Sequence, residues 1–260
     1  MNNYFRFHFY MSIQNIGKYI IRLDSVDSTN NYTSALFAKE NPAEGTVIMA
    51  DYQEAGRGQR ETIWESEHGK NLLASIILYP KLDASDYFLF NQCISLAVQE
   101  MTETELGKEV KIKWPNDILV KRKKIAGILI ENTIRGNSFL HSIAGIGINA
   151  NQLKFQNYFL PATSFSLEKK NIYMISDLLN KLCSCLNKWY TALEKEDFDF
   201  ISSSYSKKMY KKDEPAFYES KGEKFEGIIR GVNEDGKLWI EKDNGELLKF
   251  SFKEVKFLFE

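Results

Sequence analysis

Two short apolar runs that enclose a polar, turn-rich segment limit the possible folds of this chain more than any other feature. The runs are Val110–Trp114 and Ile125–Ile130, and Asn116, Asp117 and Lys124 lie between them. Runs of this length and composition indicate β-strands. A hairpin or near-hairpin here would set the carboxylate of Asp117 beside the amine of Lys124 on a rigid sheet. That pairing suits a site that handles a phosphate ester and its metal ion.

The bulk composition is that of an ordinary globular protein. The 260 residues are 43% hydrophobic and 27% charged, with a formal net charge of -1, so the chain can form one sizeable core and has no global attraction for polyanions. Its three cysteines make no even disulfide framework and favour a reducing compartment. No apolar run approaches the roughly 20 residues of a membrane span, and the start of the chain lacks signal-peptide features. We therefore predict a cytoplasmic protein without a membrane partner.

The order of the patterns predicts an α+β fold with strands mostly in hairpins and helices on one face. Further strands are expected at 19–23, 46–50, 71–78 and 139–149, and helices from 28 to 38 and at 85–106, 172–193 and 198–209. Beyond about residue 212 the sequence pattern changes to short strands, and Asn233–Gly236 and Asp243–Gly245 between them are hairpin signals. We predict an N-terminal extension over 1–18, a large domain over 19–212 and a small β-barrel of the Src-homology-3 kind over 213–260. Met11 is an alternative start.

A glycine-rich loop, Gly56–Arg60, follows the second predicted strand. Glycines let a backbone approach a ligand closely, and the guanidinium groups of Arg57 and Arg60 can bind a carboxylate or phosphate through two hydrogen bonds. Taken alone, such a loop is also explained as a solvated turn. It matches neither a Walker loop nor a Rossmann fingerprint.

A series of motifs in one order resembles the biotin protein ligases. The series is Asp27–Asn30, Gln53, Gly56–Arg60, Trp64, Gly69–Leu72, Lys113–Asp117, Lys124–Gly127 and Gly145–Asn149. It covers roughly residues 20–150. The resemblance implies the biotin/lipoate ligase catalytic fold over 19–212, with a mixed, mostly antiparallel sheet and helices on one face, and an SH3-like barrel after it.

The resemblance also implies a two-step reaction. The carboxylate of biotin attacks the α-phosphate of ATP, giving biotinyl-5′-AMP and pyrophosphate, with Mg²⁺ as the accompanying metal. A lysine amine of a biotin carboxyl carrier domain then attacks the mixed anhydride and releases AMP. Both steps depend on neutralised phosphate charge and positioned donors more than on a covalent protein nucleophile, which fits the lack of a Ser-His or Cys-His array.

Site residues follow from the resemblance position by position. The implied biotin-binding residues, of which the first four would hold the ureido ring, are Ser28, Thr29, Asn30, Gln53, Arg57, Gly58, Gln59, Lys124, Gly127 and Gly147. The implied nucleotide-binding residues are Arg57, Arg60, Trp64, Asn116, Lys124 and Asn149. Hydroxyl and amide side chains supply the donors and acceptors that a cyclic urea needs.

The catalytic residues implied in the same way are Lys124, Asp117 and Arg57. Lys124 would bind the biotin carboxylate and phosphate oxygens. Asp117 has two open roles, holding Mg²⁺ or orienting the acceptor amine. Structural explanations also stand: a helix cap for Ser28, a core position for Trp64, and strand packing for the two glycines Gly127 and Gly147.

One position departs from the family pattern. Ligases of this type often continue the loop as G-R-G-x-x-G, whereas this chain has Glu61 at the last position. A stiffer and less positive loop is expected, and Glu61→Gly is predicted to slow the release of biotinyl-AMP.

Two other functions remain open. A lipoate ligase shares the catalytic fold, but its usual R-R-x-S-G-G-G-like run is not found in the sequence. A biotin-sensing protein without turnover is disfavoured by Lys124 and Asp117. About 18 residues precede the first predicted strand, too few for the winged helix of the bifunctional ligases, and the basic run 121–124 is expected to be a solvated turn, so we predict no DNA partner. Monomer and homodimer both fit.

Overall fold

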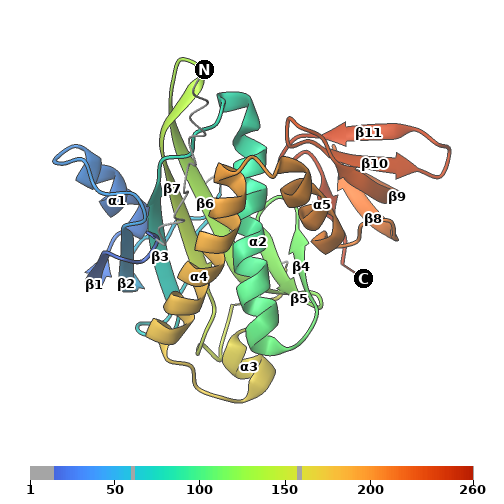
Figure 1. Ribbon diagram of the computed structural model, residues 1–260. Helices are drawn as coiled ribbons and strands as arrows, with labels where there is room; N and C mark the ends of the chain where they lie inside the picture. Colours follow the sequence, from blue (N-terminus) through green and yellow to red (C-terminus); the bar gives the residue numbers. More distant parts are fainter. Residues whose placement is uncertain (1–14, 60–61, 157–159, 260) are drawn as a thin grey trace, which may run out of the picture.

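A seven-stranded sheet forms the centre of the computed structural model, which describes residues 15–59, 62–156 and 160–259 (Figure 1). In the order β1-β2-β3-β7-β6-β5-β4, its strands are β1 (Ile20–Val26), β2 (Val47–Gln53), β3 (Leu72–Leu78), β7 (Ser138–Ile148), β6 (Lys123–Arg135), β5 (Asp117–Val120) and β4 (Val110–Lys113). Strands β1 and β2 pair in parallel and the other neighbours are antiparallel. The expected mixed, mostly antiparallel sheet is confirmed. Residues 1–14 of the predicted N-terminal extension, with the alternative start, lie outside the described residues.

The segment expected to form a near-hairpin is a three-stranded meander. Strand β4 pairs with β5, which pairs with β6, so the stretch from Asp117 is itself a strand rather than part of a connecting turn. The peptide bond between Trp114 and Pro115 is cis and lies in the β4–β5 turn. Lys121 adopts a left-handed backbone (φ 55°) in the turn between β5 and β6, which is where the basic run was expected. This register places Asp117 opposite Gly127 and next to Lys113.

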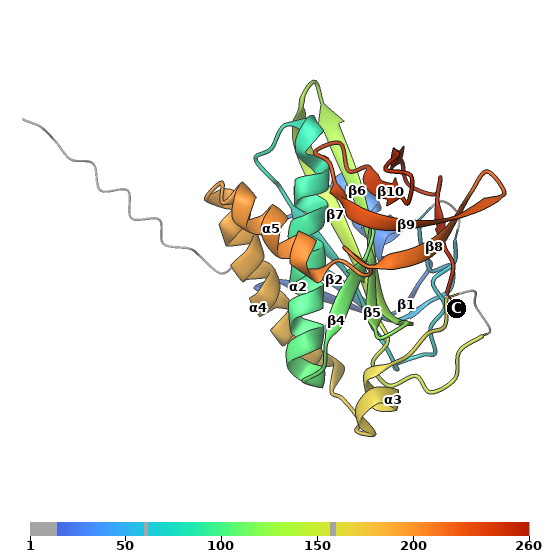
Figure 2. The ribbon, with the colours of Figure 1, turned by 90° about the vertical axis from the view of Figure 1, so that its right-hand side faces the viewer.

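Three helices cover one face of this sheet, namely α2 (Tyr87–Leu106), α4 (Ile175–Glu194) and α5 (Phe198–Lys208) (Figure 2). Helix α1 (Thr29–Phe37) does not follow the expectation of helices on one face. Its first residues contact Ser75 of β3, whereas Ala74 and Ile76 of that strand belong to the core beneath α2. Because neighbouring side chains of a strand point to opposite faces, α1 lies on the face opposite α2. Two short elements, a 3-10 turn at Ala84–Asp86 and α3 (Phe165–Lys169), complete the domain.

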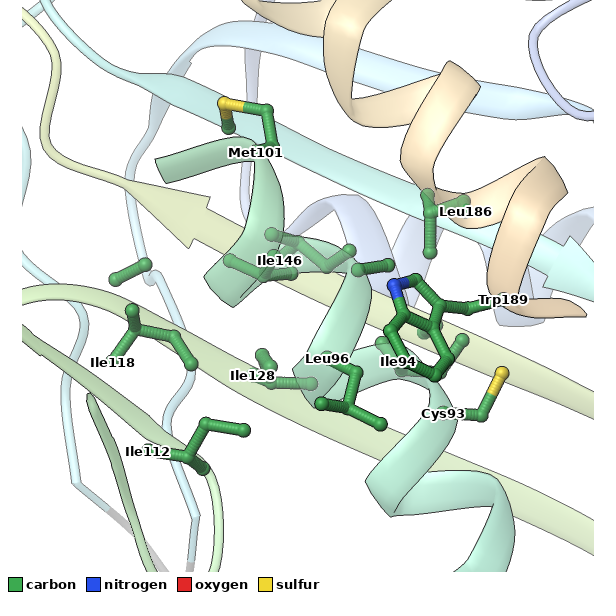
Figure 3. Packing of buried hydrophobic residues seen from close by; sticks show 14 of the residues in the cluster. Cys93, Ile94, Leu96, Met101, Ile112, Ile118, Ile128, Ile146, Leu186 and Trp189 are labelled. Atoms are coloured by element: carbon green, nitrogen blue, oxygen red, sulfur yellow. The ribbon is translucent and has the colours of Figure 1, made fainter. Parts of the chain in front are cut away.

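Helix α2 is buried almost all round. Every residue from 92 to 99 is buried, because the sheet covers one side of the helix and α4 and α5 cover the other. Figure 3 shows Leu96 near Ile128 of the sheet, and Trp189 of α4 beside Cys93. The cysteines are free, and burial raises the pKa of Cys183 to about 11. Burial therefore favours the uncharged thiol form of Cys183.

A second sheet follows the change of texture near residue 212. Its strands β8 (Pro215–Ser220), β9 (Glu223–Val232), β10 (Leu238–Lys242), β11 (Leu247–Phe250) and β12 (Lys256–Phe257) pair antiparallel in the order β11-β10-β9-β8-β12. Both predicted hairpin turns are confirmed, with Gly236 and Gly245 in the left-handed conformation. The described pairings include no bond between β11 and β12. The turn between β9 and β10 is bonded to the large domain, because Tyr87 Oη of α2 donates to the Asp235 carbonyl (2.7 Å) and Trp114 Nε1 donates to the Gly236 carbonyl (3.1 Å).

No helix within the described ranges is long and apolar enough to cross a membrane.

Candidate active site

A cavity of about 690 Å³ lies on the α1 face of the seven-stranded sheet and reaches the second sheet. It is lined by every described residue that the sequence predicted for the site: Ser28, Thr29, Asn30, Gln53, Arg57, Gly58, Gln59, Trp64, Asn116, Asp117, Lys124, Gly127, Gly147 and Asn149. Arg60 lies outside the described residues, and so does Glu61, where the chain departs from the family pattern. Segments more than a hundred residues apart in the sequence therefore meet around one space.

One end of the cavity is polar because α1 begins there. Ser28 occupies the N-cap position, yet its hydroxyl makes no hydrogen bond to the helix. The backbone N–H of Thr29 donates to Gln53 Oε1 (2.8 Å). Ser75 of β3, which the sequence did not single out, lies behind this end and contacts Thr29 Oγ1 (2.8 Å) and Asn30 Oδ1 (2.6 Å). Of the predicted urea-binding side chains, those of Thr29, Asn30 and Gln53 thus form one hydrogen-bonded group with Ser75.

The glycine-rich loop folds into a narrow ribbon along the cavity wall. Gly58 N donates to the Thr62 carbonyl and Trp64 N donates to the Gly56 carbonyl. A side chain on Gly56 would place its Cβ 2.3 Å from the carbonyl oxygen of Trp64, so glycine is required for this close approach. The described part of the loop is a turn held by backbone hydrogen bonds.

Arg57 of this loop is held by residues of α1 and β6. Its guanidinium donates to Asn31 Oδ1 (2.6 Å) and to Glu131 Oε1 (2.8 Å). Glu131 also accepts from Asn30 Nδ2 (2.7 Å). The Arg57 side chain remains 44% exposed, so the group stays near solvent. Glu131 therefore links the loop to the polar end of the cavity, a role that the sequence did not indicate.

The indole of Trp64 lies over the two glycines that face each other in β6 and β7. Gly127 and Gly147 are register partners. An added Cβ would lie 3.0 Å from Trp64 Cζ3 at Gly127 and 2.5 Å from Trp64 Cε2 at Gly147. The ring nitrogen Nε1 is buried without a hydrogen-bond partner, and the Lys124 ammonium lies 5.4 Å from the ring centroid. The two glycines therefore leave the space that the indole occupies against the sheet.

A carboxylate between two lysines forms the other end of the cavity. Lys124 Nζ lies 2.6 Å from Asp117 Oδ1, and Lys113 Nζ lies 3.6 Å from Asp117 Oδ2. Burial opposes ionisation of Asp117, but the charges of Lys124 and Lys113 hold its pKa below the usual value. Burial lowers the pKa of Lys113, against the opposing effect of Asp117. The cluster carries two ammonium groups for one carboxylate, an excess of positive charge that suits phosphate oxygens.

The two asparagines predicted to bind the nucleotide both make hydrogen bonds to the backbone of neighbouring segments. Asn116 Nδ2 donates to the Ile128 carbonyl, and Asn149 Nδ2 donates to the Thr163 carbonyl (3.0 Å). Both side chains are buried at the cavity wall. Each therefore fixes a loop against the sheet, and their part in binding a nucleotide stays a prediction.

Sequence reasoning missed the contribution of the second sheet. Phe252, Lys253, Lys256 and Phe257 line the same cavity. The Lys113 ammonium lies 4.8 Å from the ring centroid of Phe257. These residues belong to no motif, and no sequence signal indicated that a small sheet near the end of the chain would complete a site built around residue 117.

The residues do not favour Asp117 as a metal ligand. Both of its oxygens already face ammonium groups, and a divalent cation there would meet two positive charges in addition. The described residues contain no group of three or more acidic, histidine or cysteine side chains that could hold a metal ion. The role of Asp117 in orienting an amine stays a prediction.

Comparisons with known proteins agree with one another. Residues 23–149 match the model of the biotin/lipoate A/B protein ligase family. The chain is 37% identical over 137 residues to the bifunctional ligase/repressor BirA of Bacillus spizizenii, a match that covers 53% of this chain and 42% of that protein. It is 26% identical over 222 residues to the biotin--[acetyl-CoA-carboxylase] ligase of Paracoccus denitrificans, covering 83% of this chain and 91% of that protein.

The fold also matches a solved structure over nearly its whole length. The biotin protein ligase from Aquifex aeolicus, in complex with biotin and ATP, superposes with a TM-score of 0.76 at 25% identity and covers 92% of this chain and 98% of that chain. The match to the Bacillus protein, by contrast, spans less than half of that protein's length.

Proposed function

The chain belongs to the biotin/lipoate A/B protein ligase family, and on that basis we propose that it is an ATP-dependent biotin protein ligase. One observation carries the proposal. A single cavity has a hydroxyl- and amide-rich end beside α1 and a lysine–carboxylate cluster at the β4–β6 meander. A molecule with a cyclic urea at one end and a carboxylate at the other has the polarity to match both ends.

In the proposed complex, the ureido ring of biotin meets Ser28, Thr29 and Gln53. Its carboxylate lies at the opposite end, next to Lys124. This orientation follows from the chemistry of the two ends, since a carboxylate would be repelled by the acceptor oxygens beside α1 and attracted by the ammonium groups near Asp117.

Activation requires two negatively charged reactants to approach each other. The biotin carboxylate attacks the α-phosphorus of ATP, the bond from that phosphorus to the bridging oxygen of pyrophosphate breaks, and biotinyl-5′-AMP forms. Lys124 and Lys113 would stabilise the charge that develops on the phosphate oxygens, as positioned cations do in phosphoryl chemistry. Arg57 is bonded to Asn31 and Glu131 near the beginning of α1, so its contact with a phosphate stays an expectation from the family resemblance.

Transfer to the acceptor follows on the same site. A lysine amine attacks the acyl carbon of biotinyl-5′-AMP, AMP leaves with the electrons of the broken acyl–oxygen bond, and the amine loses a proton. We place Asp117 beside this amine as the group that orients it. Mg²⁺, expected with ATP, is placed on phosphate oxygens and water, its usual ligands, rather than on Asp117.

The acceptor in this proposal is the biotin carboxyl carrier domain of a biotin-dependent carboxylase. The relative from Paracoccus denitrificans is named for acetyl-CoA carboxylase, which supports this class of partner. Lipoate is the main competing substrate because the family includes both kinds of ligase. The polar end of the cavity favours biotin, since a dithiolane ring has no N–H or C=O group to offer it.

The test is biotin-dependent exchange of labelled pyrophosphate into ATP, with lipoate as the matched substrate. Exchange with biotin alone, followed by labelling of a carrier-domain peptide, is the expected result. Exchange with lipoate alone would indicate a lipoate ligase instead of a biotin ligase. Tight binding of biotin without exchange would identify a biotin-sensing protein instead.

A further inference from the structure

The backbone of Lys124 is hydrogen-bonded on one side to a segment that belongs to no strand of the two sheets. Lys124 N donates to the Pro161 carbonyl (2.7 Å), and Thr163 N donates to the Lys124 carbonyl (2.9 Å), so residues 161–163 run parallel to β6 here. Strand β7 pairs with β6 only from Ala126 onward, and β5 shifts its register between Ala126 and Lys124. Segment 161–163 therefore supplies the pairing that β7 does not give at Lys124.

Thr163 connects this segment to two other elements. Its carbonyl accepts from Asn149 Nδ2 (3.0 Å), directly after β7, and its hydroxyl donates to Glu168 Oε1 of α3 (2.9 Å). Thr163 is only 1% exposed, so water cannot readily replace a lost partner. Together with the bond to Lys124, the N–H, carbonyl and hydroxyl of Thr163 join β6, the end of β7 and α3.

Glu168 is itself held in place as an acceptor. Its other oxygen, Oε2, lies 2.9 Å from Lys108 Nζ, and the same ammonium donates to the Glu168 carbonyl (3.1 Å). Burial opposes ionisation of Glu168, but the hydrogen bonds from Lys108 and Thr163 hold its pKa below the usual value. Because an ionised carboxylate only accepts, the Thr163 hydroxyl has a fixed acceptor in a side chain that is 13% exposed.

We propose that Glu168 is a positioning residue for Lys124, because it fixes the Thr163 hydroxyl and thereby the backbone from which the Lys124 side chain extends. The inference rests on the proposed function and deepens it, since Lys124 is the cation placed beside the reacting phosphate. The described residues that line the cavity include Lys124 and Ala162, but not Thr163 or Glu168. Glu168 therefore acts on the reaction through Thr163 and Lys124 rather than by touching a substrate.

A loosened backbone at Lys124 should slow the reaction more than it weakens binding. The Lys124 ammonium reaches Asp117 Oδ1 at 2.6 Å, and the proposed charge stabilisation depends on cations that are in place before the reaction. A misplacement of about 1 Å can cost about a hundredfold in rate. Thr163 keeps its two backbone bonds when the hydroxyl bond is lost, so we expect a smaller effect. The kcat should fall about tenfold, and the KM for biotin should change less than about twofold.

Thr163→Val is the decisive substitution, because valine has nearly the shape of threonine and lacks the hydroxyl. Thr163→Ser keeps the hydroxyl and should keep the wild-type kcat. Glu168→Ala removes the acceptor instead and should reproduce the effect of Thr163→Val. Ser164→Ala is the matched control: this neighbouring hydroxyl is also buried and accepts from Leu167 N within α3 (3.2 Å). Its loss weakens α3 and leaves the bond from Thr163 to Glu168.

The experiment measures biotin-dependent pyrophosphate exchange and thermal unfolding for each variant. Every exchange measurement is repeated in a Lys124→Ala background. A residue that acts only through Lys124 has no further effect on kcat once the lysine side chain is gone. A fault in packing alone would slow exchange in both backgrounds, so the double variant separates positioning from structure.

The expected result is a kcat about tenfold lower in Thr163→Val and in Glu168→Ala, and a kcat near wild type in Thr163→Ser and Ser164→Ala. Adding Thr163→Val to Lys124→Ala should cause no further fall. Three outcomes overturn the inference: a wild-type kcat in Thr163→Val or Glu168→Ala, an equal fall in the Lys124→Ala background, or an equal fall in Ser164→Ala. Should Thr163→Val fail to fold, Glu168→Ala decides. No wild-type exchange with biotin would instead refute the proposed function and the inference with it, whereas the three outcomes above leave the proposed function standing.

Discussion

A methyl group added at Gly147 tests the packing of Trp64 directly. An alanine Cβ there would lie 2.5 Å from Trp64 Cε2, 2.7 Å from Cζ2 and 2.9 Å from Nε1. These separations are far below the 3.5–4.0 Å at which carbon atoms attract each other. The backbone of Gly147 is in a paired strand, so the indole has to move.

The expected cost can be bounded from two opposing effects. Overpacking a well-filled site costs about 1–3 kcal/mol, while replacing glycine by alanine restricts the unfolded chain and recovers about 0.4–1 kcal/mol. The net destabilisation should be about 1–2 kcal/mol, which lowers the melting temperature by about 2–8 °C for a chain of this size. The KM for biotin should rise too, because the displaced indole enters the cavity.

A double-mutant cycle with Trp64→Ala separates this clash from other effects. In the Trp64→Ala background, Gly147→Ala should be neutral or slightly stabilising, giving a coupling energy of at least about 1 kcal/mol between the two sites. Thermal unfolding of the four proteins and their biotin KM values provide the measurements. The reasoning would be refuted if Gly147→Ala also lowered the melting temperature in the Trp64→Ala background. It would be refuted as well if the single variant Gly147→Ala unfolded at the wild-type temperature.

Three further substitutions address the charged cluster and the second sheet. Lys124→Ala should slow pyrophosphate exchange about 10²–10³-fold, by analogy with the loss of one charge-stabilising donor, and a rate near wild type would remove Lys124 from the chemistry. The pKa of Asp117 is lower in the folded protein than in the unfolded chain. Ionised Asp117 therefore stabilises the folded protein fully above the unfolded value of about 3.9, and this contribution is lost as the pH falls through the folded value. When the pH drops below about 4, the melting temperature of Asp117→Asn should therefore fall less than that of wild type. Trp114→Phe removes the bond to the Gly236 carbonyl (3.1 Å) and should lower the urea unfolding free energy by about 1–3 kcal/mol, whereas an unchanged midpoint would show that this contact is replaced.

The order of strands and helices could be predicted well from local patterns, and the failures have local causes. Strand β5 has four residues and follows a proline and an asparagine, so the turn signal was stronger than the strand signal. Helix α3 has five residues, too few for a helical period to appear. Helix α2 is buried on both sides, because α4 and α5 cover the side that a two-layer fold would expose. That covering depends on tertiary packing, which periodicity does not encode.

The residues of the site also divide into those that local sequence could predict and those that it could not. Residues within motifs could be assigned to the cavity because the motifs carry the chemistry in their own side chains. Ser75 looked like one small residue in an apolar strand, and its importance arises only because β3 lies beneath the start of α1. Glu131 lies within β6, directly after the apolar run of that strand, and 101 residues from the Asn30 amide that donates to it. Their roles depend on contacts across the sheet, so a single sequence cannot reveal them.

Lys113 shows why the second sheet cannot be separated from the chemistry. Its ammonium is 3.6 Å from Asp117 and lies 4.8 Å from the ring centroid of Phe257 in β12. The aromatic ring attracts this cation and also covers it, leaving 16% of the lysine side chain exposed. Because charges interact more strongly where water is excluded, the ring strengthens the hold of Lys113 on the carboxylate. The sequence pattern therefore changes near residue 212, but the electrostatics of the cavity depend on residues before and after that position.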